Sequence, residues 1–73
     1  MSARPVKRSL TLHGHRTSVS LEDPFWHEFR RIAETRGLSV NELAGLVDED
    51  RGLASGLASA IRVFVLEEAL KRE

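Results

Sequence analysis

Polar and apolar residues alternate over much of the first third of the chain. The apolar members of the pattern are Leu10, Leu12, Val19 and Leu21, with Thr17 in phase with the last two. A period of two residues is that of a β-strand with one buried face. The pattern predicts extended structure over about residues 7–21, after a basic arm at residues 1–6 that has no periodicity and is expected to be flexible. Gly14 interrupts the pattern and is interpreted as a kink, a bulge or the centre of a turn.

A helical pattern follows at about residues 24–36. Asp23 precedes Pro24, a pair typical of a helix start, because the carboxylate can accept from first-turn amides and proline fits the first helical position. Apolar residues then recur at helical spacing, at Phe25, Phe29, Ile32 and Ala33. Gly37 is expected to end this helix.

Two more helices are predicted, at about residues 40–49 and 55–72. Ser39 is expected to cap the first of them, and Glu42 completes a capping box three residues later. The polar stretch from Asp48 to Gly52 indicates a break between the two helices. The last helix contains a run from Ala60 to Leu66 that is apolar on nearly every side.

The apolar composition of the last helix indicates how the chain assembles. A helix that is apolar on all sides must be covered on all sides, and two short amphipathic helices offer too little surface. A chain of 73 residues is also marginally stable on its own. We therefore expect a homodimer in which a second copy packs against this helix. A three-helix core within one chain is the alternative that the same pattern allows.

The charges are distributed unevenly, although the formal net charge is zero. Residues 1–16 carry four basic side chains and no acid, while residues 17–73 carry 7 basic and 11 acidic side chains. A cationic segment on an acidic body attracts phosphate through its local field. A solvated tail without a partner is the other interpretation.

Composition argues against several classes of protein. The chain has no cysteine, which excludes disulfides and thiolate metal sites. The longest apolar run, Val63 to Leu66, is far too short for a membrane span, and the N-terminus lacks the apolar core of a secretory signal. We expect a cytoplasmic protein with no membrane partner.

Candidate chemistry is sparse. His13 and His15 place two imidazoles on one face of the predicted strand, but a structural zinc site needs four ligands and His27 is the only other histidine. No nucleophile, base and orienting group form a recognisable set, and there is no glycine-rich phosphate loop. Neither a metal, nor another cofactor, nor an enzymatic activity is expected.

Several segments of the chain carry a resemblance to a known family. The strand Arg16-Thr-Ser-Val-Ser-Leu21 runs directly into a capped helix, and Arg36-Gly-Leu-Ser-Val-Asn-Glu42 follows that helix as a turn into the next. In this order the chain resembles a ribbon-helix-helix repressor of the Arc and MetJ type. With Lys7-Arg8-Ser9 and the stretch from Ser59 to Phe64, it is similar to a short bacterial subgroup of that family.

The resemblance implies a fold class and an assembly. The expected fold is mostly α with an N-terminal β-ribbon, in an intertwined homodimer with an intermolecular antiparallel two-stranded sheet, plus an extra C-terminal helix. The residues expected in the dimer core are Val19, Leu21, Phe25, Phe29, Ile32, Leu43, Ile61, Phe64 and Val65. Two registers are open: either the Ser39 helix is the family's second helix, or residues 39–52 are an insertion and the last helix takes that place.

The resemblance also implies a double-stranded DNA partner. In the family the ribbon enters the major groove, which is wide enough to admit it. With Val19 and Leu21 turned toward the core, Arg16, Ser18 and Ser20 face the base edges, and Arg16 is the main reader because it can bond guanine O6 and N7 together. An ordinary solvated strand face is the alternative for the two serines.

Phosphate contacts are expected on both sides of the ribbon. The family clamps phosphate with the N-terminus of its second helix, here Ser39, Val40 and Asn41. Further phosphate contacts are assigned to Arg4, Lys7, Arg8, His13 and His15. The predicted function is sequence-specific DNA binding by a transcriptional repressor. The alternative is a dimeric protein-interaction module, such as an antitoxin or an adaptor, with a protein partner.

Overall fold

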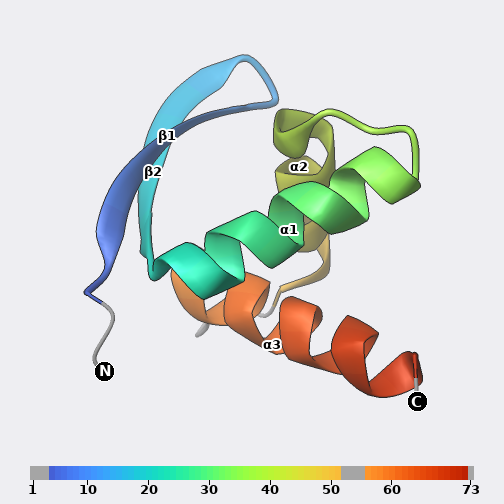
Figure 1. Cartoon of the computed structure of the whole chain (residues 1–73). Helices are drawn as coiled ribbons and strands as arrows, with labels where there is room; N and C mark the ends of the chain where they lie inside the picture. The colour runs from blue at the N-terminus through green and yellow to red at the C-terminus, as the bar shows by residue number, and fades with distance from the viewer. Residues whose placement is uncertain (1–3, 52–55, 73) are drawn as a thin grey trace.

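Two strands and three helices follow one another along the chain (Figure 1). The computed structural model describes residues 4–51 and 56–72. The elements are β1 (Val6–Leu12), β2 (His15–Leu21), α1 (Asp23–Thr35), α2 (Val40–Asp50) and α3 (Leu57–Lys71). A ribbon followed by three helices confirms the predicted fold class.

The ribbon is an antiparallel hairpin formed within one chain. β1 pairs with β2 so that Val6 lies opposite Leu21 and Leu12 opposite His15. The two connecting residues, His13 and Gly14, have φ angles of 52° and 81°, as a type I′ turn requires. Gly14 is therefore part of a turn, and the single predicted strand is two strands. Strand pairing between two chains remains a prediction.

The start of α1 differs from its prediction. Glu22 is the N-cap residue and makes no capping hydrogen bond with its side chain. The carboxylate of Asp23 instead accepts from the guanidinium of Arg8 in β1. That guanidinium also lies 5.2 Å from the ring centroid of Trp26. The predicted Asp23 cap was wrong, because the ion pair occupies this carboxylate and fastens the ribbon to α1.

The connection from α1 to α2 contains the helix stop and the helix cap that the sequence predicted. Gly37 has a φ of 70°, and the N–H of Leu38 donates to the Ala33 carbonyl at 2.9 Å, which is the glycine-ended helix stop expected here. The capping box at the start of α2 is confirmed, since Ser39 Oγ accepts from the Glu42 amide and the Glu42 carboxylate accepts from the Ser39 amide. Gly52, at which a break was predicted, lies outside the described residues, as do residues 1–3 of the predicted arm.

The core lies between the inner face of the ribbon and the three helices. Phe29 of α1 is fully buried at its centre and contacts the ring of Phe64 edge-on at 6.0 Å between centroids. The buried apolar residues are Leu10, Leu12, Val19, Leu21, Phe29, Ile32, Ala33, Leu43, Ala44, Val47, Ile61 and Val65. Seven of the nine residues expected in a dimer core are in this set, and Phe25 and Phe64 pack against it. One chain therefore covers these seven side chains by itself, and their place in a dimer core stays a prediction.

α3 is covered on one side only. Ile61 and Val65 are buried against the body of the chain, whereas Val63, Leu66 and Leu70 are exposed. The sequence predicted that α3 would be covered on all sides. The chain itself covers only the face that carries Ile61 and Val65. Within residues 4–51 and 56–72, no helix has both the length and the apolar composition to cross a membrane.

Candidate nucleic-acid interface

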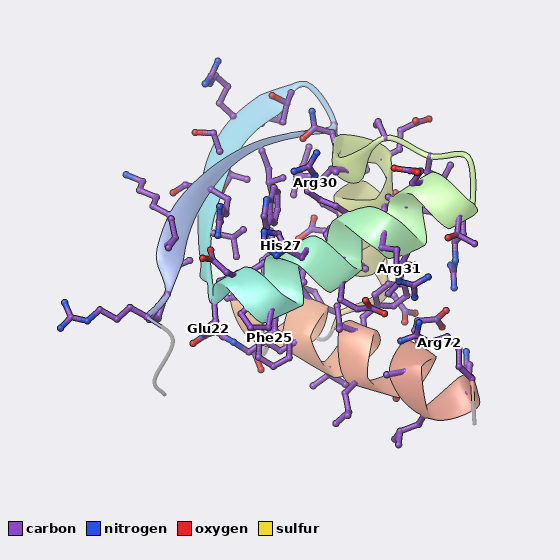
Figure 2. The ribbon with its side chains drawn as sticks, viewed as in Figure 1. Glu22, Phe25, His27, Arg30, Arg31 and Arg72 are labelled. Atoms are coloured by element: carbon purple, nitrogen blue, oxygen red, sulfur yellow. The ribbon has the colours of Figure 1, made fainter. Side chains whose placement is uncertain are left out.

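The outer face of the ribbon is polar and solvent-exposed. Because β1 and β2 are in antiparallel register, Lys7 lies beside Ser20, Ser9 beside Ser18, and Thr11 beside Arg16. All six side chains are exposed. Figure 2 shows side chains projecting from the hairpin on the side away from the helices. Two cations and four hydroxyl groups thus share one surface, which we call the outer ribbon face.

Three of these residues were predicted as base contacts and one as a phosphate contact. Arg16, Ser18 and Ser20 come together on β2 as the alternation required, and Lys7 stands across from Ser20. Ser9 and Thr11 were missed. The signal for them was the pair His13-Gly14 between two alternating segments, which as a two-residue turn would have placed these hydroxyls opposite Ser18 and Arg16.

Several other predicted contacts lie elsewhere. Arg8 is on the inner face of the ribbon, opposite Val19, where Asp23 and Trp26 hold its guanidinium. His15 is exposed but lies opposite Leu12 on that same inner side. His13 is in the turn, with Nε2 3.5 Å from the Glu49 carboxylate of α2. None of the three belongs to the outer ribbon face.

The basic side chains divide into free and paired groups. Among the described residues, Arg4, Lys7, Arg16 and Arg30 make no ion pair, and the first three come from the N-terminal segment. Residues 1–21 contain no acid. The positive charge of this segment is therefore not neutralised locally, apart from Arg8.

The body of the chain neutralises nearly all of its own positive charge. Its ion pairs are Arg31 and Arg72 with Glu28, Arg36 and Lys71 with Glu68, Arg51 with Asp48, and Arg62 with Glu22. The bond from Arg31 lowers the pKa of Glu28, and bonds from Lys71 and Arg36 lower that of Glu68, so both carboxylates are charged at neutral pH. Arg31 of α1 and Arg72 of α3 both donate to the Glu28 carboxylate, which joins the two helices (Figure 2).

The N-terminus of α2 lies against the edge of the ribbon. The Thr11 amide donates to Asn41 Oδ1 at 3.0 Å, which joins the ribbon to the first turn of the helix. The amides of Val40 and Asn41 make no hydrogen bond within the described residues. The capping box uses the amides of Ser39 and Glu42, and the bond that the Ser39 amide donates to the Glu42 carboxylate lowers the pKa of that carboxyl. The negative charge of the Glu42 carboxylate disfavours the binding of a second anion at the same helix end.

The histidines do not converge. His13 is in the ribbon turn, His15 is on β2, and His27 is on the exposed side of α1 (Figure 2). In the part of the chain that the structure describes, no three histidine, aspartate or glutamate side chains are grouped closely enough to hold a metal ion.

Comparison with known proteins identifies the family. A family model described as a ribbon-helix-helix domain matches residues 5–69, a span that includes the ribbon, α1, α2 and most of α3. Neither the curated proteins nor the solved structures gave a match. Ribbon-helix-helix proteins are DNA-binding regulators that typically act as dimers, and the fold is not that of an enzyme. With nearly its whole length matched, the chain belongs to the ribbon-helix-helix domain family.

Proposed function

We propose that the outer ribbon face enters the DNA major groove and reads base edges, and that the protein acts as a dimeric transcriptional repressor. The observation that carries this proposal is the combination of exposed hydroxyls with cations that no acid neutralises. A two-stranded ribbon fits the width of the major groove. Elsewhere among the described residues, the basic side chains other than Arg4 and Arg30 are paired with carboxylates.

Arg16 is the proposed base reader. Its guanidinium is exposed and makes no ion pair, so both of its parallel N–H groups are available for guanine O6 and N7. Beside it, the Thr11 hydroxyl, and next along the ribbon those of Ser9 and Ser18, can donate or accept. We assign these hydroxyls to the base edges as well, with weaker discrimination than the arginine.

Lys7 and Arg4 are the proposed phosphate partners in each chain. Lys7 is at the far end of the outer ribbon face from Arg16, and Arg4 precedes β1. We assign a third phosphate contact to the free amides of Val40 and Asn41 at the edge of the ribbon, which is weakened by the Glu42 carboxylate at the same helix end. Arg8 is not assigned to phosphate, because its guanidinium pairs with Asp23 on the inner side of the ribbon.

A double substitution on the outer ribbon face tests this proposal. We expect Lys7→Gln combined with Arg16→Gln to lower the affinity for duplex DNA by at least about tenfold, because a phosphate contact and a base contact are both lost. Fluorescence anisotropy with a labelled duplex measures the change. The far-UV circular dichroism spectrum should stay unchanged, because both side chains are exposed and make no contact with the core.

Arg30→Gln is the matched control, because Arg30 is exposed, makes no ion pair within the described residues and is on α1 (Figure 2). It removes the same type of charge without touching the ribbon, so the affinity should change by less than about twofold. Equal losses for the control and the double variant would contradict a ribbon interface.

A further inference from the structure

The open end of the hairpin lies opposite the turn, where the ribbon joins α1. Val6 of β1 and Leu21 of β2 form the last pair of the register there. The pair next to them, on the outer ribbon face, is Lys7 and Ser20. A two-stranded hairpin is only marginally stable in water by itself, and chain ends are the first parts to separate. The placement of Lys7 and Ser20 therefore depends on what holds this end of the ribbon.

Arg8 holds the β1 side of the open end. Its guanidinium donates to the Asp23 carboxylate at the start of α1 and lies 5.2 Å from the Trp26 ring centroid, which is within cation–π distance. Because side chains alternate along a strand, Arg8 is on the inner face while its neighbours Lys7 and Ser9 face outward. Holding the Arg8 side chain therefore holds the backbone that carries both outer residues.

Arg62 of α3 holds the β2 side of the same end. Its Nη2 donates to the Ser20 carbonyl at 3.2 Å, and its Nε donates to the Glu22 carboxylate at 2.9 Å. The guanidinium also lies 5.8 Å from the ring centroid of Phe25. Glu22 and Phe25 lie at the junction of β2 and α1 (Figure 2). Each strand is thus held by one arginine that pairs with a carboxylate at this junction and faces an aromatic ring of α1.

Arg8 is poorly suited to a role in stability alone. Leu10 and Leu12, which follow it on the inner face of β1, are buried, and an apolar residue at position 8 would extend their row. The Nε of Arg8 is instead buried without a hydrogen-bond partner among the described residues, which costs free energy. A partly buried ion pair is weak evidence for stability, and in some proteins such groups fix a specific geometry instead.

We propose that Arg8 is a positioning residue for DNA recognition, and that with Asp23 and Trp26 it forms a ribbon clamp that fixes the Lys7 end of the outer ribbon face. A face that is already fixed loses less conformational entropy on binding than one that must become ordered on the DNA. The clamp should matter most for a duplex whose base edges are read, and less for unrelated duplexes, where phosphate contacts dominate. This inference rests on the proposed function.

Asp23→Asn tests the ribbon clamp, because two roles of Arg8 give opposite results. If Arg8 were itself a phosphate contact, removal of the acid would release its charge, and the affinity for any duplex would rise. If Arg8 positions the ribbon, the affinity for a duplex that the wild type selects from a random pool should fall at least about threefold, while that for an unrelated duplex changes less than about twofold. Fluorescence anisotropy with the two labelled duplexes measures both.

Two variants are the controls. Asp23→Glu keeps a carboxylate within reach of Arg8 and should retain most of the affinity for the selected duplex. Glu34→Gln removes an acid from the other end of α1, where Glu34 is exposed and makes no ion pair within the described residues, and it should not lower that affinity. Circular dichroism should show the same helix content in all three variants, because Asp23 and Glu34 are exposed.

Trp26 gives a measurement that needs no DNA. It is the one tryptophan of the chain, so the emission reports the surroundings of this ring alone. In Asp23→Asn the Arg8 guanidinium is no longer held against the ring, and quenching of Trp26 by acrylamide should increase. Asp23→Glu should be quenched to nearly the same degree as the wild type.

The outcomes separate this inference from DNA binding. Wild-type quenching of Trp26 in Asp23→Asn would overturn the ribbon clamp, even if the protein binds DNA. Increased quenching with unchanged or tighter binding of the selected duplex would overturn the positioning role and leave the proposed function standing. A wild type that binds no duplex would remove the proposed function and the positioning role together, and the quenching would still decide whether the clamp exists.

Discussion

Arg16→Ala is expected to lower the affinity for the preferred DNA site by roughly 5- to 150-fold, which corresponds to the loss of about 1–3 kcal/mol from one bidentate guanine contact. Affinity for unrelated duplexes should fall much less, because the phosphate contacts of Lys7 and Arg4 remain. Sequence preference is therefore lost while weak binding persists. Selection of bound duplexes from a random pool, for the wild type and the variant in parallel, measures the change directly.

Arg16→Lys is the matched variant for this prediction. It keeps the positive charge but replaces the planar fork with a single ammonium group, so binding to unrelated DNA should be close to that of the wild type while the preference declines. Melting temperatures of both variants should match the wild type, since Arg16 is exposed and unpaired. A variant that lacks the arginine and still selects the same site would mean that other residues read the bases.

The second large effect concerns stability. Phe29→Ala should destabilise the fold by about 3–5 kcal/mol, because a fully buried ring is replaced by a cavity. The loss includes contacts of the ring with Phe64 at 6.0 Å and Trp26 at 6.4 Å between centroids. A domain of this length has a total stability of about 4–11 kcal/mol, so a large fraction of the variant should be unfolded or close to it. Urea denaturation followed by circular dichroism measures the change.

Leu46→Ala serves as the comparison for Phe29→Ala. Leu46 is about half exposed, so its truncation should change the free energy of unfolding by less than about 1 kcal/mol. If Phe29→Ala unfolded at nearly the same urea concentration as the wild type, the single-chain core would not be the main source of stability, and cover from a second chain would have to supply it.

The sequence predicted the helices and the polarity of β2 because strong local signals mark them. The Ser39–Glu42 capping box and Gly37 stop are contacts between residues close in sequence, so they were recognised without tertiary information. Alternation along β2 identified the exposed side of Arg16 for the same reason. The turn at His13-Gly14 was left open, because the pair is a weaker turn signal than the Asn-Gly or Asp-Gly pairs that usually form such turns.

The sequence could not show contacts between distant residues. The phosphate contact of Arg8 stays a prediction, and in the structure its guanidinium is bound by Asp23, which lies 15 residues later. That pairing also removed the predicted role of Asp23 as a helix cap. α3 was expected to need cover on every side, yet folding of the ribbon and two helices onto it protects Ile61 and Val65 within one chain. Which face remained exposed depended on the tertiary packing.

The salt dependence of binding tests the central claim most directly. If the outer ribbon face binds the DNA backbone through Arg4 and Lys7 of two chains, the logarithm of the affinity should fall with the logarithm of salt concentration at a slope of about −3 to −4. The slope should become shallower in the Lys7→Gln variant. Affinity for duplex DNA that is independent of salt, or no measurable binding at low salt, would contradict the account.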